Sequence, residues 1–187
     1  MQRGINIFLG FTFGLLIFFP ALIISLAIKA TSSGPVIFWS SRIGKGNKVF
    51  QMPKFRTMQI ETPPDIASHL LKAPERYMTL IGRLLRKTSL DELPQVWSVI
   101  KGDMALVGPR PALPNQDDLI TMRTRSGIHN LPPGITGWAQ ILGRDELLIP
   151  EKVKLDEFYL NNRSLILDLK ILLLTFGTVL KGKQISH

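Results

Sequence analysis

The N-terminal part of the chain holds a long apolar run. Residues 5–28 contain no charged side chain, and as an α-helix they would extend about 36 Å, enough to cross the hydrocarbon core of a bilayer. Pro20 lies two-thirds of the way along this run, where it removes a backbone donor and costs about 3 kcal/mol in a straight helix. The pattern therefore predicts a membrane helix with a kink at Pro20.

Basic residues flank this run on both sides. Arg3 precedes it, and no acidic residue occurs before Glu61. The cations that follow the run are Lys29, Arg42, Lys45, Lys48, Lys54 and Arg56. If both flanks obey the positive-inside bias, the helix enters and leaves by the same face, which a bend at Pro20 would allow. The residues alone leave this re-entrant helix and a simple span equally open, and they disfavour a cleaved signal peptide because the run is too long.

The next segment has the pattern of a small β-structure. Two β-prone runs, residues 35–39 and 48–52, are joined by a Gly-rich turn at 44–47, which predicts a β-hairpin. Phosphate binding by the glycines of this turn is the weaker interpretation, because no helix follows them. The proline-punctuated residues 61–65 predict a surface loop.

The remainder of the chain reads mostly as helix. Apolar residues at helical spacing predict a helix over residues 76–86. Ser89 and Glu92 form a Ser-x-x-Glu capping box, which predicts a second helix running to about residue 100, although Pro94 permits a later start. Residues 155–159 predict a packed amphipathic helix, with Tyr159 placed at the membrane interface.

The C-terminal apolar run, residues 165–180, contains only Asp168 and Lys170 as charged residues. A second membrane span is one interpretation, but the run is short and its charges lie inside it, so an interfacial helix over 165–181 is favoured. From the residues we therefore expect a mostly α membrane protein with a small β-hairpin and interfacial amphipathic helices.

Composition narrows the chemistry. The 187 residues carry a formal net charge of +9 and no cysteine, which excludes disulfides, thiolate metal sites and cysteine nucleophiles. The three histidines are scattered without ligand spacing, so a histidine metal site or a catalytic triad has little support. The basic charge fits attraction to anionic lipid, and no helix-turn-helix or aromatic RNA-binding block favours nucleic acid.

Two adjacent carboxylates, Asp91 and Glu92, lie where the chain enters a helix. Acidic residues in a first helical turn are usually electrostatic caps. Here they stand among rigid Gly/Pro loops that carry single cations. Arg110 has a proline on each side, which fixes the neighbouring backbone and suits bidentate binding of phosphate. A turn arginine paired to a carboxylate is the alternative for Arg110, and equally for Arg86 and Arg144.

Together these segments resemble a known family. The blocks are KFRTM at 54–58, SLDELPQ at 89–95, KGDM at 101–104, VGPRP at 107–111 and PGITGWAQ at 133–140. In this order, over nearly the full length, they resemble the bacterial sugar transferases known as monotopic polyprenyl-phosphate phosphoglycosyl transferases, in their minimal catalytic form. A series of blocks is far more specific than any one of them. The resemblance also favours the re-entrant form of the N-terminal helix, so it implies a monotopic membrane protein with a re-entrant membrane helix at 1–29, broken at Pro20, and a catalytic domain at 30–187.

The resemblance implies an activity. Such enzymes move a sugar-1-phosphate from a UDP-sugar to a polyprenyl phosphate such as undecaprenyl phosphate, releasing UMP, at the cytoplasmic face of the bacterial inner membrane. This is the first membrane step of glycoconjugate assembly, and downstream glycosyltransferases are the expected further partners. In the family, the aspartate of an Asp-Glu pair attacks the β-phosphate of the donor and forms a covalent phosphosugar intermediate, which the lipid phosphate then resolves in a ping-pong sequence. The adjoining glutamate is associated with the required Mg²⁺.

The resemblance also assigns individual residues. Asp91 matches the family's nucleophile, and Glu92 the glutamate associated with Mg²⁺, with Asp91 as an additional metal ligand. The expected substrate and phosphate contacts are Arg86, Arg110, Arg144, Lys54, Arg56 and Asp168. For Asp168, a catalytic role and helix pairing stay open.

The chain departs from the family at three places. Phe19 precedes Pro20 where relatives have a serine, Asn6 stands where an aspartate is frequent, and Pro132 replaces a frequent arginine. One anion contact of the family is therefore either missing here or replaced, with Arg123 and Arg125 as the candidates for replacement. The other function classes are a noncatalytic scaffold that binds anionic lipid, and a phosphohydrolase in which water resolves the aspartyl intermediate.

Overall fold

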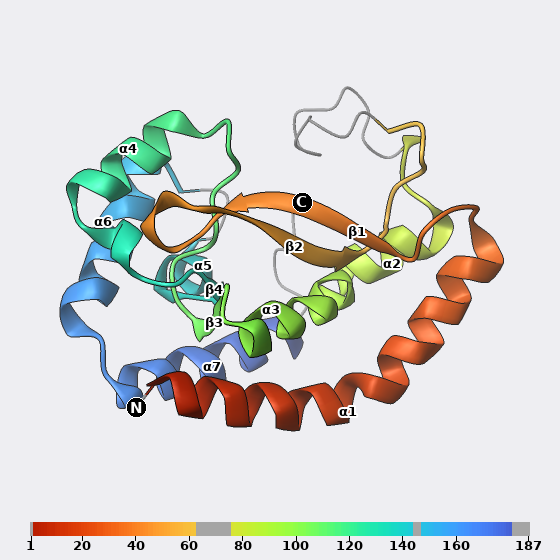
Figure 1. Cartoon of the computed structure of the whole chain (residues 1–187), viewed down its shortest axis with the longest axis horizontal. Coiled ribbons are helices and arrows are strands. Elements are labelled where there is room, and N and C mark those ends of the chain that lie inside the picture. The colour runs from red at the N-terminus through yellow and green to blue at the C-terminus, as the bar shows by residue number, and fades with distance from the viewer. Residues whose placement is uncertain (1, 63–75, 144–146, 181–187) are drawn as a thin grey trace.

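The computed structural model describes residues 2–62, 76–143 and 147–180. Within them the chain is mostly helical, as predicted, and its two sheets have two strands each (Figure 1). The helices are α1 (Gln2–Thr31), α2 (Leu80–Lys87), α3 (Val96–Lys101), α4 (Asp117–Arg125), α5 (Trp138–Leu142), α6 (Ile149–Asn162) and α7 (Leu165–Leu180). The strands are β1 (Ile37–Ile43), β2 (Val49–Phe55), β3 (Ala105–Val107) and β4 (Gly134–Thr136).

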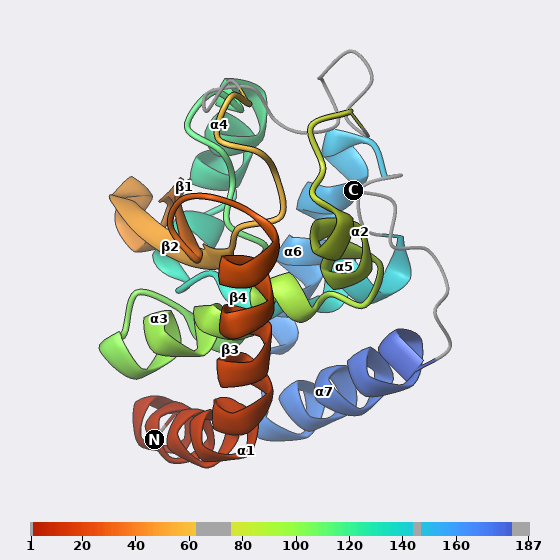
Figure 2. The same ribbon diagram turned by 90° about the vertical axis from the view of Figure 1, so that its right-hand side faces the viewer.

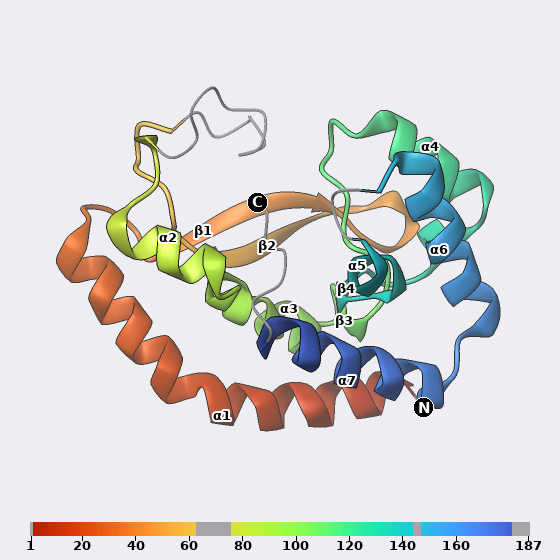
Figure 3. The same cartoon turned by 180° about the vertical axis from the view of Figure 1, so that it is seen from behind.

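Helix α1 is long, apolar and bent. Pro20 lies inside it, and Figure 2 shows its second half rising away from the first, as expected where proline interrupts the hydrogen-bond ladder. In the described part of the chain it is the one helix long and apolar enough to cross a membrane. Figure 3 shows α7 along the same edge of the molecule as the first half of α1.

Both ends of α1 are fixed to the rest of the protein. Near its start, the guanidinium of Arg3 donates to the carbonyls of Val99 and Ile100, both at 2.7 Å. Asn6 Oδ1 accepts from the amide of Leu106 at 3.2 Å. Near its end, Ile28 is fully buried in a cluster with Phe55 and Leu85. Between these anchors α1 exposes large apolar side chains, namely Phe8, Phe11, Leu15, Leu16, Phe18, Phe19, Ile23 and Leu26.

The predicted hairpin is confirmed. Strands β1 and β2 pair antiparallel from Ile37 opposite Phe55 to Ile43 opposite Val49. The turn between them needs the left-handed region at two adjacent residues, Gly46 and Asn47, with φ of 67° and 60°. Glycine and asparagine are the residue types that adopt this conformation most readily. Of the loop predicted at 61–65, residues 63–65 lie outside the described residues.

The predicted helices on either side of residue 90 are confirmed in part: a helical segment begins after Ser89, with Asp91 and Glu92 in its first turn, and continues to Lys101. Helix α2 begins at Leu80, not at residue 76, because Thr79 caps it by accepting from the amide of Gly82 at 2.9 Å. Ser89 makes no side-chain cap and lies in the left-handed region with φ of 56°. The capping box is therefore absent, and a 3₁₀ helix, Leu90–Gln95, precedes α3. Pro94 lies within that 3₁₀ segment and donates no backbone hydrogen bond.

The central core joins elements from both ends of the chain. Val99, Met104, Leu106 and Ile171 are buried together with Tyr159. The placement of Tyr159 at a membrane interface was wrong: its ring is buried and its hydroxyl donates to Asp168 Oδ1 at 2.7 Å. A parallel pairing of β3 with β4, which the pattern did not predict, lies over this core.

Candidate active site

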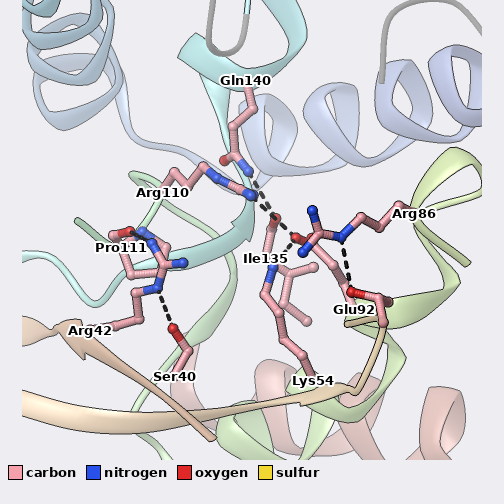
Figure 4. A network of polar contacts seen from close by, with 10 residues as sticks. Ser40, Arg42, Lys54, Arg86, Glu92, Arg110, Pro111, Ile135 and Gln140 are labelled. Atoms are coloured by element: carbon pink, nitrogen blue, oxygen red, sulfur yellow. Dashed lines mark hydrogen bonds and ion pairs between the residues drawn. The ribbon is translucent and has the colours of Figure 1, made fainter. Parts of the chain in front are cut away.

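The carboxylate of Glu92 is the centre of a cluster of cations (Figure 4). Lys54 Nζ lies 2.7 Å from Glu92 Oε1, and Arg110 Nη2 lies 3.2 Å from the same oxygen. The three residues come from β2, from the 3₁₀ segment and from the loop after β3. Three of the sequence blocks, far apart in the chain, therefore meet at one carboxylate.

Arg86 and Thr57 form the second side of this cluster. Arg86 Nε donates to Thr57 Oγ1 at 2.9 Å. Gly82 permits this arrangement, because a Cβ at that position would lie 2.0 Å from the Thr57 carbonyl oxygen. The close approach of α2 to the end of β2 carries Arg86 toward Asp91, and the two charges interact.

Asp91 is the least satisfied polar group of the site. Its side chain is 4% exposed, and among the described residues its Oδ1 has no hydrogen-bond partner. Burial raises the pKa of Asp91 to about 6, with Lys54 opposing the shift, Glu92 adding to it and Arg86 opposing it. A buried carboxyl oxygen without a partner is costly for stability, and perturbed carboxyl groups of this kind cluster at functional sites.

The pKa of Glu92 is shifted in the opposite direction to that of Asp91. Burial alone would raise the pKa of Glu92, but Lys54 and Arg110 outweigh burial and hold that pKa well below its usual range. The pKa values of the two adjacent carboxyl groups are thus shifted in opposite directions, that of Asp91 toward neutral pH and that of Glu92 far enough down to keep it ionised. Such a separation is typical of paired carboxylates that have different chemical roles.

The carboxylates of this site can be compared with those that bind magnesium in proteins. No group of three or more His, Cys, Asp or Glu side chains that could hold a metal occurs in the described ranges. Mg²⁺ in phosphoryl-transfer sites usually takes one or two carboxylates, with phosphate oxygens and waters completing its shell. The unpartnered oxygen of Asp91 and the ionised Glu92 fit that requirement, provided that a substrate phosphate supplies the remaining oxygens.

The other expected contacts divide into three cases. Arg144 lies outside the described residues. Arg56 is buried, and the structure directs its guanidinium to the loop after α1, where it donates to the carbonyls of Ser32 and Ser33 and to Ser32 Oγ. Asp168 accepts from Tyr159 and joins α7 to α6. Neither Arg56 nor Asp168 lies in the cluster around Glu92.

The predictions from the sequence missed one residue of the site, Thr57, and misplaced one anion contact. The hydroxyl of Thr57 orients Arg86, and the signal was its position inside the KFRTM block. Arg123, expected as a replacement anion contact, instead pairs with Asp156 at 2.6 Å. Arg125, the other candidate, is exposed on α4.

Comparison of the sequence with known proteins matches the chain to one family. A family model described as bacterial sugar transferase matches residues 1–182. The chain is 44% identical over 181 residues to an uncharacterized sugar transferase of Bacillus subtilis (strain 168), covering 97% of this chain and 86% of the relative.

Two longer relatives have more specific names. An undecaprenyl-phosphate glucose phosphotransferase of Komagataeibacter xylinus is 41% identical, with 82% of this chain and 31% of the relative covered. A UDP-N-acetylgalactosamine-undecaprenyl-phosphate N-acetylgalactosaminephosphotransferase of Aeromonas hydrophila is 35% identical, with 97% and 44% covered. The chain thus spans less than half the length of these two relatives.

Proposed function

Since the chain belongs to the bacterial sugar transferase family, we propose that it transfers a sugar-1-phosphate from a UDP-sugar to a polyprenyl phosphate. The names of the relatives describe undecaprenyl-phosphate sugar phosphotransferases. The observation that carries the proposal is Asp91, a buried carboxylate with an unpartnered oxygen, beside an ionised Glu92 and three cations.

The first step of the proposed reaction forms an aspartyl intermediate. A carboxylate oxygen of Asp91 attacks the β-phosphorus of the UDP-sugar, a new O–P bond forms, and the bond from that phosphorus to the bridging oxygen breaks. UMP leaves with the bridging oxygen and its electron pair. Deprotonated Asp91 is the reacting form, and it dominates above pH 6 because the pKa of Asp91 is about 6.

The second step regenerates the carboxylate. An oxygen of the polyprenyl phosphate attacks the same phosphorus, and the bond from phosphorus to Asp91 breaks. The products are the polyprenyl diphosphosugar and free Asp91, so the sequence is ping-pong. Lys54, Arg86 and Arg110 supply positive charge where the diphosphate and the departing UMP carry negative charge.

Glu92, with Asp91, would hold Mg²⁺, which when bound neutralises part of the diphosphate charge. The ionised state of Glu92 suits this role, because a metal ligand must be deprotonated. Lys54 and Arg110 both contact Glu92 Oε1. We propose that these two cations move from Glu92 toward phosphate oxygens when a donor binds.

The exposed apolar surface supports a membrane location for this site. We propose that α1 enters and leaves by the cytoplasmic face of the bacterial inner membrane, bent at Pro20, and that α7 lies in the interface. The chain has no cysteine, so one cysteine added before Gln2 can be labelled uniquely. Labelling from the cytoplasmic side only is expected; labelling from the periplasm would contradict the re-entrant topology.

A donor screen tests the activity. Purified protein is incubated with a panel of UDP-sugars and Mg²⁺, with and without undecaprenyl phosphate, and UMP is measured. We expect one donor to give sustained UMP release only when the lipid phosphate is present. Release that continues at the same rate without lipid would indicate a phosphohydrolase, and no release with any donor would indicate a noncatalytic lipid-binding scaffold.

Intact-protein mass spectrometry tests the intermediate. Without the lipid acceptor, we expect the donor to leave one sugar phosphate covalently attached to the protein. Peptide mapping should place this mass on Asp91. A protein that turns over but never carries the added mass would exclude the aspartyl intermediate.

A further inference from the structure

The loop that carries Arg110 is held almost entirely through its carbonyl groups. Proline at positions 109 and 111 leaves these residues without an N–H donor, so the loop depends on acceptors. Four consecutive carbonyls each accept a hydrogen bond: Pro109 from Gly134 N at 2.9 Å, Arg110 from Arg123 Nη1 at 2.7 Å, Pro111 from Arg42 Nη1 at 3.4 Å and Ala112 from Ile43 N at 2.9 Å. Two of these four donors are guanidinium groups.

Arg123 makes the shortest of these contacts and is itself clamped. Its Nε and Nη2 donate to Asp156 Oδ2 at 3.0 and 2.6 Å, while its Nη1 donates to the Arg110 carbonyl. The side chains of Arg123 and Asp156 are 11% and 3% exposed. One planar fork therefore joins α4 to α6 on one edge and to the Arg110 backbone on another, which only arginine can do.

A purely structural role explains this arrangement poorly. A buried ion pair loses much of its Coulombic gain to desolvation, and apolar residues of similar volume often replace such a pair without loss of stability. Apolar residues cannot donate to the Arg110 carbonyl. The contact that requires Arg123 is thus the one to the residue whose own guanidinium reaches Glu92.

We propose that Arg123, oriented by Asp156, is a positioning residue that fixes the backbone of Arg110 and thereby aims the Arg110 guanidinium at Glu92 and the donor diphosphate. This inference rests on the proposed function, because it assigns Arg110 to the phosphate groups. Arg123 itself does not contact the substrate: it acts through Arg110.

A double-mutant cycle separates positioning from stability. Arg123→Lys keeps a cation for Asp156 but loses the fork, and Arg123→Ala removes both contacts. Each is made alone and together with Arg110→Ala, and UMP release and the affinity for UDP are measured. Because a displacement of about 1 Å can cost roughly 10²-fold in rate, we expect Arg123→Lys to lower turnover about 10- to 100-fold while the melting temperature stays close to that of the wild type.

The cycle gives the decisive result in the Arg110→Ala background. If Arg123 acts through Arg110, then adding Arg123→Lys or Arg123→Ala to Arg110→Ala changes turnover and UDP affinity by no more than about twofold, since sites that share one function are not additive. An equal loss in both backgrounds would overturn the inference. Arg83→Lys, a charge-conserving change at an exposed arginine of α2, is the matched control and should leave both quantities unchanged.

The outcome also distinguishes this inference from the proposed function. Wild-type UMP release with additive losses in the cycle would overturn the role of Arg123 alone. UDP binding without turnover would count against the proposed reaction, while the cycle measured on UDP affinity still decides the role of Arg123. A wild-type protein that neither turns over nor binds UDP would overturn both.

Discussion

Two regions of the molecule bury an aspartate beside basic side chains, and they differ in how fully the oxygens of that aspartate are bonded. In the Arg123–Asp156 pair, three guanidinium nitrogens reach two acceptors, and neither residue has a buried polar atom without a partner. At the active site, Asp91 is as deeply buried as Asp156, yet its Oδ1 has no partner among the described residues. Burial alone therefore does not distinguish the two aspartates; the incomplete bonding of Asp91 does, and it is the reason for proposing Asp91 as the nucleophile.

The difference also has an energetic meaning. A satisfied pair orders the structure around it, whereas an unsatisfied carboxylate stores unfavourable free energy that a substrate or metal can relieve. The charges of Lys54 and Arg86 reduce this cost, while that of Glu92 adds to it, and none of them bonds Oδ1 of Asp91. The two regions should consequently respond in opposite ways to the same chemical change.

The largest expected effect comes from neutralising each aspartate. Asp91→Asn should abolish both UMP release and labelling by a radioactive sugar phosphate, at least about 10³-fold below the wild type, because a nucleophile is lost. It should not lower the free energy of unfolding at pH 8. The folded state raises the pKa of Asp91 to about 6, so the stabilising contribution of this group is present at low pH and is lost as the pH rises through 6.

Asp156→Asn should act first on stability, and on turnover only indirectly, through Arg123 and the Arg110 backbone. It leaves the buried Arg123 charge without compensation, which typically costs about 3–5 kcal/mol of stability. Chemical denaturation of both variants, beside their turnover, measures the comparison. If Asp91→Asn lost stability and kept activity, the two regions would have exchanged roles and the proposed reaction would fail.

Glu92→Gln is expected to have the next largest effect. It removes the charge that binds Lys54 and Arg110 and the proposed metal ligand, so turnover should fall about 10²-fold, as for loss of one preorganised electrostatic contact. The dependence on Mg²⁺ should weaken as well. A magnesium titration that is unchanged from the wild type would refute a metal role for Glu92.

A smaller effect is expected from Lys54, and its diagnostic part is the pH dependence rather than the loss of one phosphate contact. Wild-type kcat/KM should fall about tenfold per pH unit below 6, where Asp91 becomes protonated. Lys54 lowers the pKa of Asp91, so Lys54→Met should move this acidic limb to higher pH. Lys48→Met, at an exposed lysine in the turn between the same two strands, is the control and should leave the limb in place. If the acidic limb does not shift in Lys54→Met, the fall in kcat/KM at low pH does not report the protonation of Asp91.

The sequence predicted those parts of the molecule that depend on local pattern. The apolar run with Pro20, the hairpin and the C-terminal helix follow from periodicity and turn chemistry, and the blocks around Lys54, Asp91 and Arg110 do meet. Periodicity could not predict the left-handed Ser89, because tertiary contacts and Pro94 decide how the chain enters α3. The same holds for the parallel pairing of β3 with β4.

The sequence also could not predict which side chains pair with one another in the folded protein. Arg123 and Asp156 lie 33 residues apart, and no spacing rule joins them. Lys54 and Arg56 are two residues apart in one block, yet one reaches Glu92 and the other reaches the loop after α1. A resemblance between sequences transfers a block as a unit, but it does not say which of its cations serves the substrate.

The smallest effect on catalysis is expected from Arg56. This residue therefore gives the strictest test of the distinction between Lys54, which contacts Glu92, and Arg56, which contacts the loop after α1. Its guanidinium is bonded to Ser32 and Ser33, and hydrogen bonds from a charged group contribute about 1.5–3 kcal/mol. Arg56→Gln should lower the free energy of unfolding by about that amount, while KM for the UDP-sugar stays within about twofold of the wild type. A large rise in KM with unchanged stability would return Arg56 to the phosphate site. It would also show that the loop after α1 releases this arginine when the donor binds.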